Sequence, residues 1–396
     1  MTPPPRGHRG LAQRVRALFD DPPLPRELES PEAVDVAWVS ETGRPLATAG
    51  SDTGEPEPLA EAVEAYVLAG PGGGREAGAV LDRAIEAAGR GPATPSAADA
   101  VESLLRYAAR DESALARARA LVSPGVASLL VRRLGELPDE GRRSLLLQRL
   151  PELGREIREA TVEALRKPPA RGLAQGPAGQ GLLSLLATLT RSAPGMLEEL
   201  VMDPDWRVVV AVVTITSERG GDGVLQILTL ALTHDHPRVR RQALAALRKL
   251  GGQEAGELAL SMLEDRDWTV RSEAARAVGD LNVSRGTGPL VERLRAEDHP
   301  EVLAANIEAL GALRDASVVV ELEGWTGHRT AGERSFELRA AALRALHRIG
   351  TPHALRIVEE ASGDDDPRVR ELVEILTEAG PAEAESSAVE EGGAGE

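Results

Sequence analysis

The stretch Asp235-His-Pro-Arg-Val-Arg-Arg-Gln-Ala-Leu-Ala-Ala-Leu247 decides how this chain of 396 residues is expected to fold. Val239, Ala243 and Leu247 follow one another at intervals of four residues, which places them on one stripe of an α-helix. Pro237 stands in the first turn, where its missing N–H breaks no hydrogen bond, and the residues before it suit an N-cap. Because Ala243 is small, a second helix can approach closely here. The stretch predicts an amphipathic helix that packs against neighbouring helices.

The same pattern returns at a nearly constant interval. Its leading aliphatic residue recurs after 31, 31, 32, 36 and 31 residues, at Val208, Val239, Val270, Val302, Leu338 and Val369. Second apolar segments fill the intervals, at residues 225–232, 258–263, 290–294, 318–322 and 355–361. Two helices of about three turns, joined by short turns, account for such a period. The repeats predict a solenoid of stacked helix pairs, whose motif helices begin near residues 206, 237, 268, 300, 335 and 367.

The motif Asp-x-Pro-Arg-Val-Arg-x-x-Ala-x-x-x-Leu, read from Asp235 to Leu247, resembles HEAT repeats. More closely it is similar to the short HEAT-like repeats first met in bacterial phycobilin lyases. The resemblance is clearest over residues 203–378, and it implies an all-α fold, a right-handed α-solenoid of armadillo type. Ankyrin and tetratricopeptide arrays have similar periods, but their signature residues are missing here.

Three regions are expected along the chain. The solenoid should run over 96–380, since weaker apolar helix patterns precede the clear repeats. Residues 1–95 match no family that we recognise; they allow a β-hairpin over 33–48 and two helices over 59–68 and 75–88. Residues 381–396 hold five Glu and no basic residue, which predicts a disordered acidic tail.

Composition excludes several classes of protein. The chain has no Cys, so disulfide scaffolds, zinc ribbons, iron–sulfur sites and cysteine nucleophiles are excluded. A formal net charge of -17 argues against a general nucleic-acid binder. Neither a secretory signal nor an apolar run of about 20 residues is present, so we expect a cytoplasmic protein. Two Lys among 46 basic residues, with abundant Ala and Gly, hint at a bacterial source with a GC-rich genome.

The segment His234-Asp235-His236 has the residue types of a metal site. We interpret it as a cap and turn, because the other repeats place their capping residues at the same point. Certain HEAT-like hydroxylases bind two irons through paired His-Glu motifs, but no His precedes a Glu here. The H-E-x-x-H, P-loop and G-x-S-x-G patterns are also missing. We therefore expect no enzyme activity, no catalytic residue, no metal and no cofactor.

Arginine follows the leading aliphatic residue in four repeats. In HEAT arrays an Asp at the turn and an Arg in the second helix form a ladder between neighbouring repeats. The resemblance therefore implies a structural ladder of Asp235, Asp267, Asp298 and Asp366 with Arg240, Arg271, Arg339 and Arg370. The alternative is that these arginines bind an acidic partner.

Two sets of residues are candidates for contact with a protein partner. One is a strip of arginines that the HEAT geometry would place on or beside the concave face, namely Arg241, Arg248, Arg276 and Arg344. The other lies in residues 324–332, where the repeat interval grows to 36 residues and brings in Trp325, His328 and Arg329. Trp and Arg are frequent anchors of interfaces, and insertions in solenoids often collect on the binding face. The alternative for this loop is a surface loop whose Trp packs onto a helix.

These features favour a non-catalytic scaffold or adaptor that binds another protein on the concave face of the solenoid. A phycobilin-lyase-like enzyme or chaperone subunit is the alternative, and it rests on the repeat class alone. Nucleic-acid binding through a local arginine strip, formed by Arg238, Arg241, Arg248 and Arg276, is a second alternative. A gene neighbourhood with phycobiliprotein genes would favour the lyase, and a strongly salt-dependent complex with DNA would favour nucleic-acid binding.

Overall fold

The computed structural model describes residues 58–70, 75–137, 139–167, 177–193, 195–221, 223–327 and 335–379. Every regular element in these ranges is a helix, and no strand occurs in them, which confirms the all-α class. The β-hairpin considered for residues 33–48 and the acidic tail lie outside the described residues. The chain divides into two compact units. Among the described residues, the N-terminal unit ends at residue 221 and the C-terminal unit begins at residue 223.

The N-terminal unit is built from short helices that pack in succession. Helix α2 packs on α3 and α4, α3 packs on α5, and α4 packs on α6, which in turn contacts α8 and α9. The boundary near residue 96 stays a prediction. The helices are α2 (Pro58–Leu68), α3 (Arg75–Gly89), α4 (Pro95–Tyr107), α5 (Glu112–Leu121), α6 (Pro124–Glu136), α7 (Glu140–Arg149), η2 (Leu150–Leu153), α8 (Arg155–Arg166), α9 (Pro177–Ser192), α10 (Gly195–Leu200) and α11 (Trp206–Arg219).

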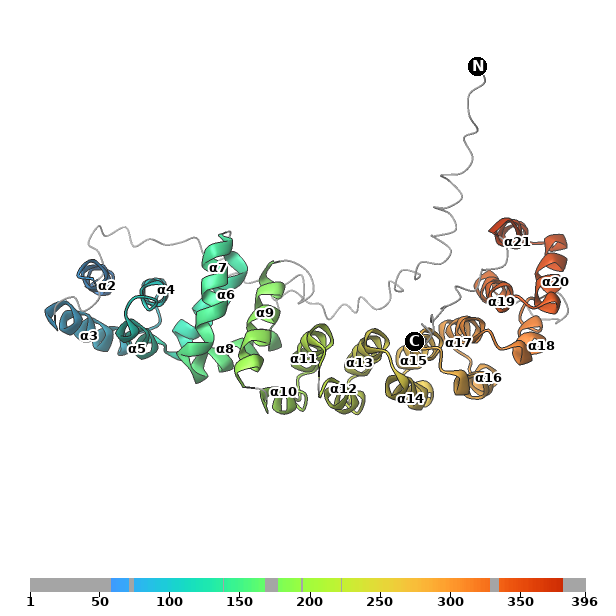
Figure 1. Ribbon diagram of the computed structural model, residues 1–396, viewed down its shortest axis with the longest axis horizontal. Coiled ribbons are helices and arrows are strands. Elements are labelled where there is room, and N and C mark those ends of the chain that lie inside the picture. The colour runs from blue at the N-terminus through green and yellow to red at the C-terminus, as the bar shows by residue number, and fades with distance from the viewer. Residues whose placement is uncertain are drawn as a thin grey trace, which may run out of the picture. The chain divides into compact units, whose positions relative to one another are not determined.

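The C-terminal unit has two rows of helices. Figure 1 shows the motif helices α13, α15 and α17 in one row and α12, α14 and α16 in the other. The helices are α12 (Val224–Leu232), α13 (Pro237–Leu250), α14 (Gln253–Ser261), η3 (Met262–Glu264), α15 (Trp268–Asp280), η4 (Ser284–Gly286), α16 (Thr287–Ala296), α17 (Pro300–Leu313), η5 (Ala316–Val318), α18 (Val319–Glu323), α19 (Phe336–Ile349), α20 (Pro352–Glu360), η6 (Ala361–Gly363) and α21 (Pro367–Ala379).

The motif helices begin where the repeat predicts, within one residue in all six cases. Val239, Ala243 and Leu247 are fully buried, so the predicted apolar stripe faces the core. The core of the C-terminal unit is aliphatic, because its buried hydrophobic residues are all Leu, Val, Ile and Ala. Sequence periodicity therefore fixes both the position and the inward face of these helices.

Helices α15, α17 and α19 approach one another closely because small residues face each other. A Cβ atom added at Gly311 would lie 2.5 Å from the Cα atom of Ala345. At Gly279 it would lie 2.9 Å from the Cα atom of Ala309. Glycine is needed at both positions to let the next backbone come near.

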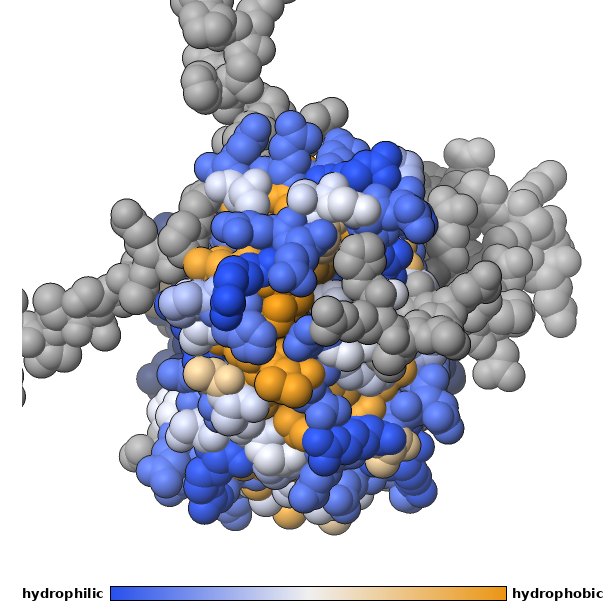
Figure 2. Space-filling view, turned by 90° about the vertical axis from the view of Figure 1, so that its right-hand side faces the viewer, coloured by the Kyte–Doolittle hydropathy of each residue, from blue (hydrophilic) through white to orange (hydrophobic). Residues whose placement is uncertain are grey.

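The outward surface of the last pair of helices is polar. Figure 2 shows the face of the C-terminal unit on which α20 and α21 lie, where hydrophilic residues cover most of the area between smaller hydrophobic patches. Glu371, Glu374 and Glu378 are exposed on α21, whereas Leu372, Val373 and Leu376 are buried. A polar outer face is what a terminal repeat needs to end a solenoid.

Membrane-spanning helices were sought in the same ranges. No single helix described there is long and apolar enough to cross a bilayer. Helices α5 and α6 meet that test only when they are taken together, and they are bent by 109° at the break between them.

Candidate interaction surface

The motif helices of the C-terminal unit share one stripe that the neighbouring helices leave uncovered. We call it the open face and define it as the residues two, six and ten positions after the leading aliphatic residue. Ser272 and Ala340 are its buried members, and most of the others are half-buried or exposed. On α13 to α19 the open face consists of Arg241, Ala245, Lys249, Ser272, Arg276, Asp280, Ala304, Glu308, Ala312, Ala340, Arg344 and Arg348.

Three of the four arginines in the strip predicted for partner contact are held by carboxylates. Arg248, which borders the open face, donates from Nη1 to Glu273 Oε1 at 2.9 Å and also pairs with Asp280. Arg276 Nη1 lies 3.8 Å from Glu273 Oε2. Arg344 donates from Nη2 to Glu308 Oε1 at 3.3 Å.

These pairs give the open face charges of both signs, with Ala between them. Arg241 is half-buried and makes no ion pair with the described residues. Burial opposes the charge of Arg248, but the hydrogen bond that it donates to Glu273 and the field of Asp280 outweigh burial and raise the pKa of Arg248. The role of these arginines in binding stays a prediction.

Only the beginning of the predicted contact loop is described. Trp325 is half-buried, and its backbone N–H donates to the carbonyl of Leu322 at 2.9 Å. The carbonyl of Thr326 accepts a hydrogen bond from Arg339 Nε at 2.9 Å, so the loop starts against α19. His328 and Arg329 lie outside the described residues, and their contact with a partner stays a prediction.

Three of the four predicted ladder arginines bridge successive repeats, but through carboxylates other than those predicted. Arg240 is buried and donates to both carboxylate oxygens of Asp265, at 2.7 Å each, and to the carbonyls of His234 and Asp235. Arg271 does the same with Glu297, at 2.7 Å and 3.0 Å, and Arg339 pairs with Asp364. Arg370 donates to the carbonyls of residues 364 and 365.

The expected acidic partners have other roles, which is a correction to the sequence analysis. Asp267 and Asp366 accept hydrogen bonds from backbone N–H groups in the first turns of α15 and α21. Asp235 is exposed and meets Arg266 at 3.3 Å. The side chain of Asp298 pairs with no described residue. A capping carboxylate already accepts the helix N–H groups, so it is not free to turn inward to the arginine.

The true ladder carboxylate stands two residues before the N-cap of the next repeat. Its oxygen also accepts the N–H of the cap residue, at 2.8 Å for Asp265 and Asp364 and 3.1 Å for Glu297. Burial raises the pKa of Glu297, but the hydrogen bonds from Arg271 and His299 outweigh it and hold that pKa below its usual value. The recurrence of an acid at this position, which includes Asp203, was the signal available in the sequence.

The segment His234-Asp235-His236 forms a cap, as predicted. His234 Nδ1 accepts a hydrogen bond from the N–H of His236 at 2.9 Å, and His236 Nδ1 accepts one from the N–H of Arg238 at 3.2 Å. Within the described ranges, no group of three or more His, Asp or Glu residues could hold a metal ion.

Aromatic residues in the first turns of α15 and α19 contact the beginning of the next motif helix. The ring of Trp268 stacks on His299, with centroids 3.9 Å apart and planes 13° apart. The guanidinium of Arg368 lies 4.4 Å from the ring centre of Phe336. Trp268 and Phe336 therefore contact residues of the following repeat.

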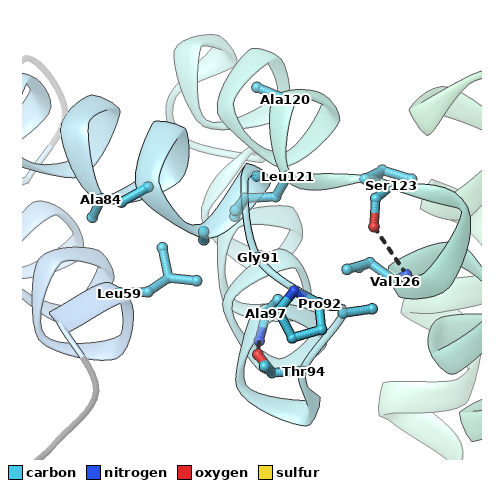
Figure 3. A pocket seen from close by; sticks show the side chains of 15 residues that line it. Leu59, Ala84, Gly91, Pro92, Thr94, Ala97, Ala120, Leu121, Ser123 and Val126 are labelled. Carbon is cyan, nitrogen blue, oxygen red and sulfur yellow. Dashed lines mark hydrogen bonds between the residues drawn. The ribbon is translucent and has the colours of Figure 1, made fainter.

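A hollow of about 340 Å³ opens among helices α2 to α6, and it was not predicted from the sequence. Figure 3 shows apolar side chains around it, contributed by α2 to α6 and by the connections between them. The residues that form its walls include Leu59, Ala84, Ala88, Pro92, Leu121 and Val126. Most of these residues are small, and they come from distant parts of the sequence, so no local sequence pattern predicts the hollow.

Comparison with known proteins agrees with this geometry. The family model for HEAT repeats matches residues 193–279, 256–334 and 287–377. The alpha subunit of phycocyanobilin lyase from Picosynechococcus sp. is 30% identical over 139 residues, which are 32% of this chain and 50% of that protein. The chain thus spans half the length of this curated relative.

Two solved structures are similar at low scores. An engineered protein has 19% identity and a TM-score of 0.34, over 81% of this chain and 93% of that one. Kap121p bound to Pho4p has 11% identity and a TM-score of 0.41, over 75% of this chain and 37% of that one.

Helix pairs that repeat every 31 residues or so, joined by a ladder of arginines and carboxylates, define a helical-repeat solenoid. Residues 193–377 match HEAT repeats, and 139 residues of the chain are similar to the alpha subunit of a phycocyanobilin lyase.

Proposed function

We propose that this protein is a non-catalytic scaffold that binds a protein partner through the open face of α13, α15, α17 and α19. The observation that carries the proposal is the chemistry of that face. It carries basic and acidic side chains that form ion pairs, with Ala245, Ala304 and Ala312 between them. Small residues leave room for partner side chains, and fixed charges of both signs give orientation and specificity.

The same chemistry disfavours a phosphate-binding groove. A nucleic-acid backbone needs basic side chains that are available to phosphate. Arg248, Arg276 and Arg344 each have a carboxylate within 4 Å, so phosphate would have to displace those carboxylates and be repelled by them. A partner with alternating acidic and basic residues suits this face better.

The similarity to a phycocyanobilin lyase subunit supports a second candidate, a role in attaching or handling bilins. It extends over half of that relative. If the chain binds a bilin, the purified protein mixed with phycocyanobilin should show a shifted and sharpened visible absorption band. An unchanged spectrum at saturating protein would remove this candidate.

The scaffold proposal is tested by quantitative affinity capture from the source cells with wild type and two variants. Ala304→Arg places a bulky cation on the open face, whereas Ala296→Arg adds the same group at the exposed end of α16, off that face. We expect a specific partner to be captured by wild type and Ala296→Arg and lost with Ala304→Arg, while all three have the same helical circular dichroism. Equal capture by the three proteins would contradict the proposal.

A further inference from the structure

The hollow in the N-terminal unit has the chemistry of a site for an apolar side chain. Its lining contains no charged residue. The hydroxyls of Thr94 and Ser123 are already used, because they accept hydrogen bonds from the N–H groups of Ala97 and Val126 at 3.2 Å and 3.3 Å (Figure 3). A polar or charged occupant would therefore lose its hydration without replacement, whereas an apolar one would not.

The size of the hollow limits what can enter it. About 340 Å³ is at the lower end of the range for small-ligand pockets. Ala84, Ala88 and Gly91 form part of its walls, so the space exists because these side chains are short. One large aromatic side chain with an aliphatic neighbour matches this space, and a whole helix does not.

The chain itself supplies such a group next to the hollow. Leu59, the second residue of α2, lines the hollow, so the described part of α2 begins at the wall of the hollow. The preceding 57 residues lie outside the described ranges, and their largest apolar side chain is Trp38, within Ala33-Val-Asp-Val-Ala-Trp-Val39. Neither acidic nor basic side chains flank Trp38 directly.

The tether is short enough to favour this occupant over free competitors. Residues 40–57 separate Val39 from α2, and a coil of that length spans roughly 20–25 Å on average. Such tethers hold a group at an effective concentration in the millimolar range. A free protein or a second copy would have to reach that concentration to displace it.

We propose that residues 33–39 dock in this hollow of their own chain, with the indole of Trp38 filling the space between Leu59, Ala88 and Leu121. This docking closes the apolar hollow and attaches the chain upstream of α2 to the first helix pairs. It is independent of the partner proposed for the open face, because it lies in the other compact unit.

Disulfide cross-linking tests the docking in the full chain, which has no Cys of its own to interfere. Ala37→Cys is combined with Ala87→Cys, an exposed residue on the rim of the hollow. The matched control combines Ala37→Cys with Ala79→Cys, an exposed Ala on the same helix that does not line the hollow. Rates are measured under a mild oxidant, and monomeric and dimeric products are separated on non-reducing gels.

We expect the pair at the rim to close within one chain on the order of tenfold faster than the control pair. Adding Trp38→Ala should reduce that rate to the control rate, while helical circular dichroism stays unchanged. Equal rates for the two pairs would overturn the docking, as would a fast rate that persists without Trp38. A product that is mainly a dimer would overturn it in favour of a second copy as the occupant.

Discussion

Asn306 occupies a position that the other motif helices give to Ala or Val, at Val212, Ala243, Ala274, Ala342 and Val373. It is fully buried, and neither its amide oxygen nor its amide nitrogen has a hydrogen-bond partner among the described residues. An unpaired buried amide costs about 1–3 kcal/mol. Since the repeat geometry accepts Ala here, the polar group weakens the C-terminal unit.

Asn306→Ala should therefore raise the free energy of unfolding by about 1 kcal/mol, measured by urea denaturation. The reverse change, Ala274→Asn, should lower it, because it places an amide in the equivalent buried position of the preceding repeat. If Asn306→Ala instead destabilises the protein, the amide is hydrogen-bonded in solution and this account of it is wrong.

Asp265 and Asp235 illustrate how burial decides the value of an ion pair. The side chains of Asp265 and Arg240 are 7% and 5% exposed, whereas Asp235 is fully exposed. Removing one partner of a buried pair leaves an uncompensated charge and costs about 3–5 kcal/mol. An exposed pair contributes about 0–1 kcal/mol.

We expect Asp265→Ala to lower the free energy of unfolding by about 3–5 kcal/mol and Asp235→Ala to change it by less than about 1 kcal/mol. Urea unfolding followed by circular dichroism measures both. Equal losses would show that the ladder runs through Asp235 after all.

Glu297 makes the stability of the C-terminal unit depend on pH. Hydrogen bonds from Arg271 and His299 outweigh burial and lower its pKa in the folded protein. A carboxyl with a lowered folded pKa stabilises the protein above its unfolded pKa, which is about 4.3. That contribution is lost as the pH falls through the lower, folded value.

The free energy of unfolding should consequently fall more steeply below about pH 4.3 in wild type than in Glu297→Gln. Exposed Glu254 supplies the control, since Glu254→Gln should keep the wild-type slope. Unfolding measured at a series of pH values gives the three slopes. Identical slopes for wild type and Glu297→Gln would exclude this contribution.

At the scale of helices, two glycines in the neighbouring helices α16 and α17 differ in the space around them, so their replacement by Ala should change stability in opposite directions. A Cβ at Gly311 of α17 would meet the Ala345 backbone at 2.5 Å, while Gly288 of α16 has open space around it. Gly311→Ala should thus destabilise by about 1–3 kcal/mol through overpacking. Gly288→Ala should stabilise by up to about 1 kcal/mol, because Ala is the better helix former. The shift of the melting temperature in thermal unfolding gives the direction of each change in stability. Shifts in the same direction for both variants would refute close packing of α17 on α19.

The helices could be predicted from the sequence because their signals are local. Helix α13 has a Pro in its first turn, an aliphatic residue two positions later and an Ala four positions after that. Variants of this pattern predict the positions of the other motif helices. The ladder was predicted only in part. Its arginines follow from the repeat, but which acid turns inward depends on hydrogen bonds within the turn.

The hollow beside α2 and the ion pairs of the open face depend on tertiary structure. Ala84, Pro92 and Leu121 have unremarkable sequence contexts, and their proximity arises from the packing of separate helices. Likewise Arg344 and Glu308 are 36 residues apart, and only the spacing of α17 and α19 brings them together. Residue patterns indicate such contacts only once the register between repeats is known.

At the scale of the whole molecule, the proposed partner-binding surface is one face of the C-terminal unit. The net charge of -17 is spread over the chain, whereas the open face holds both signs in fixed pairs. Binding there should be specific and only moderately sensitive to salt, because Arg248, Arg276 and Arg344 are already paired with carboxylates.

Amide hydrogen exchange of the complex with the captured partner locates the binding face along the chain. The partner should slow exchange in peptides from α13, α15, α17 and α19, and leave exchange in α14, α16 and α20 unchanged. Slowed exchange confined to α14, α16 and α20, or to the N-terminal unit, would contradict it.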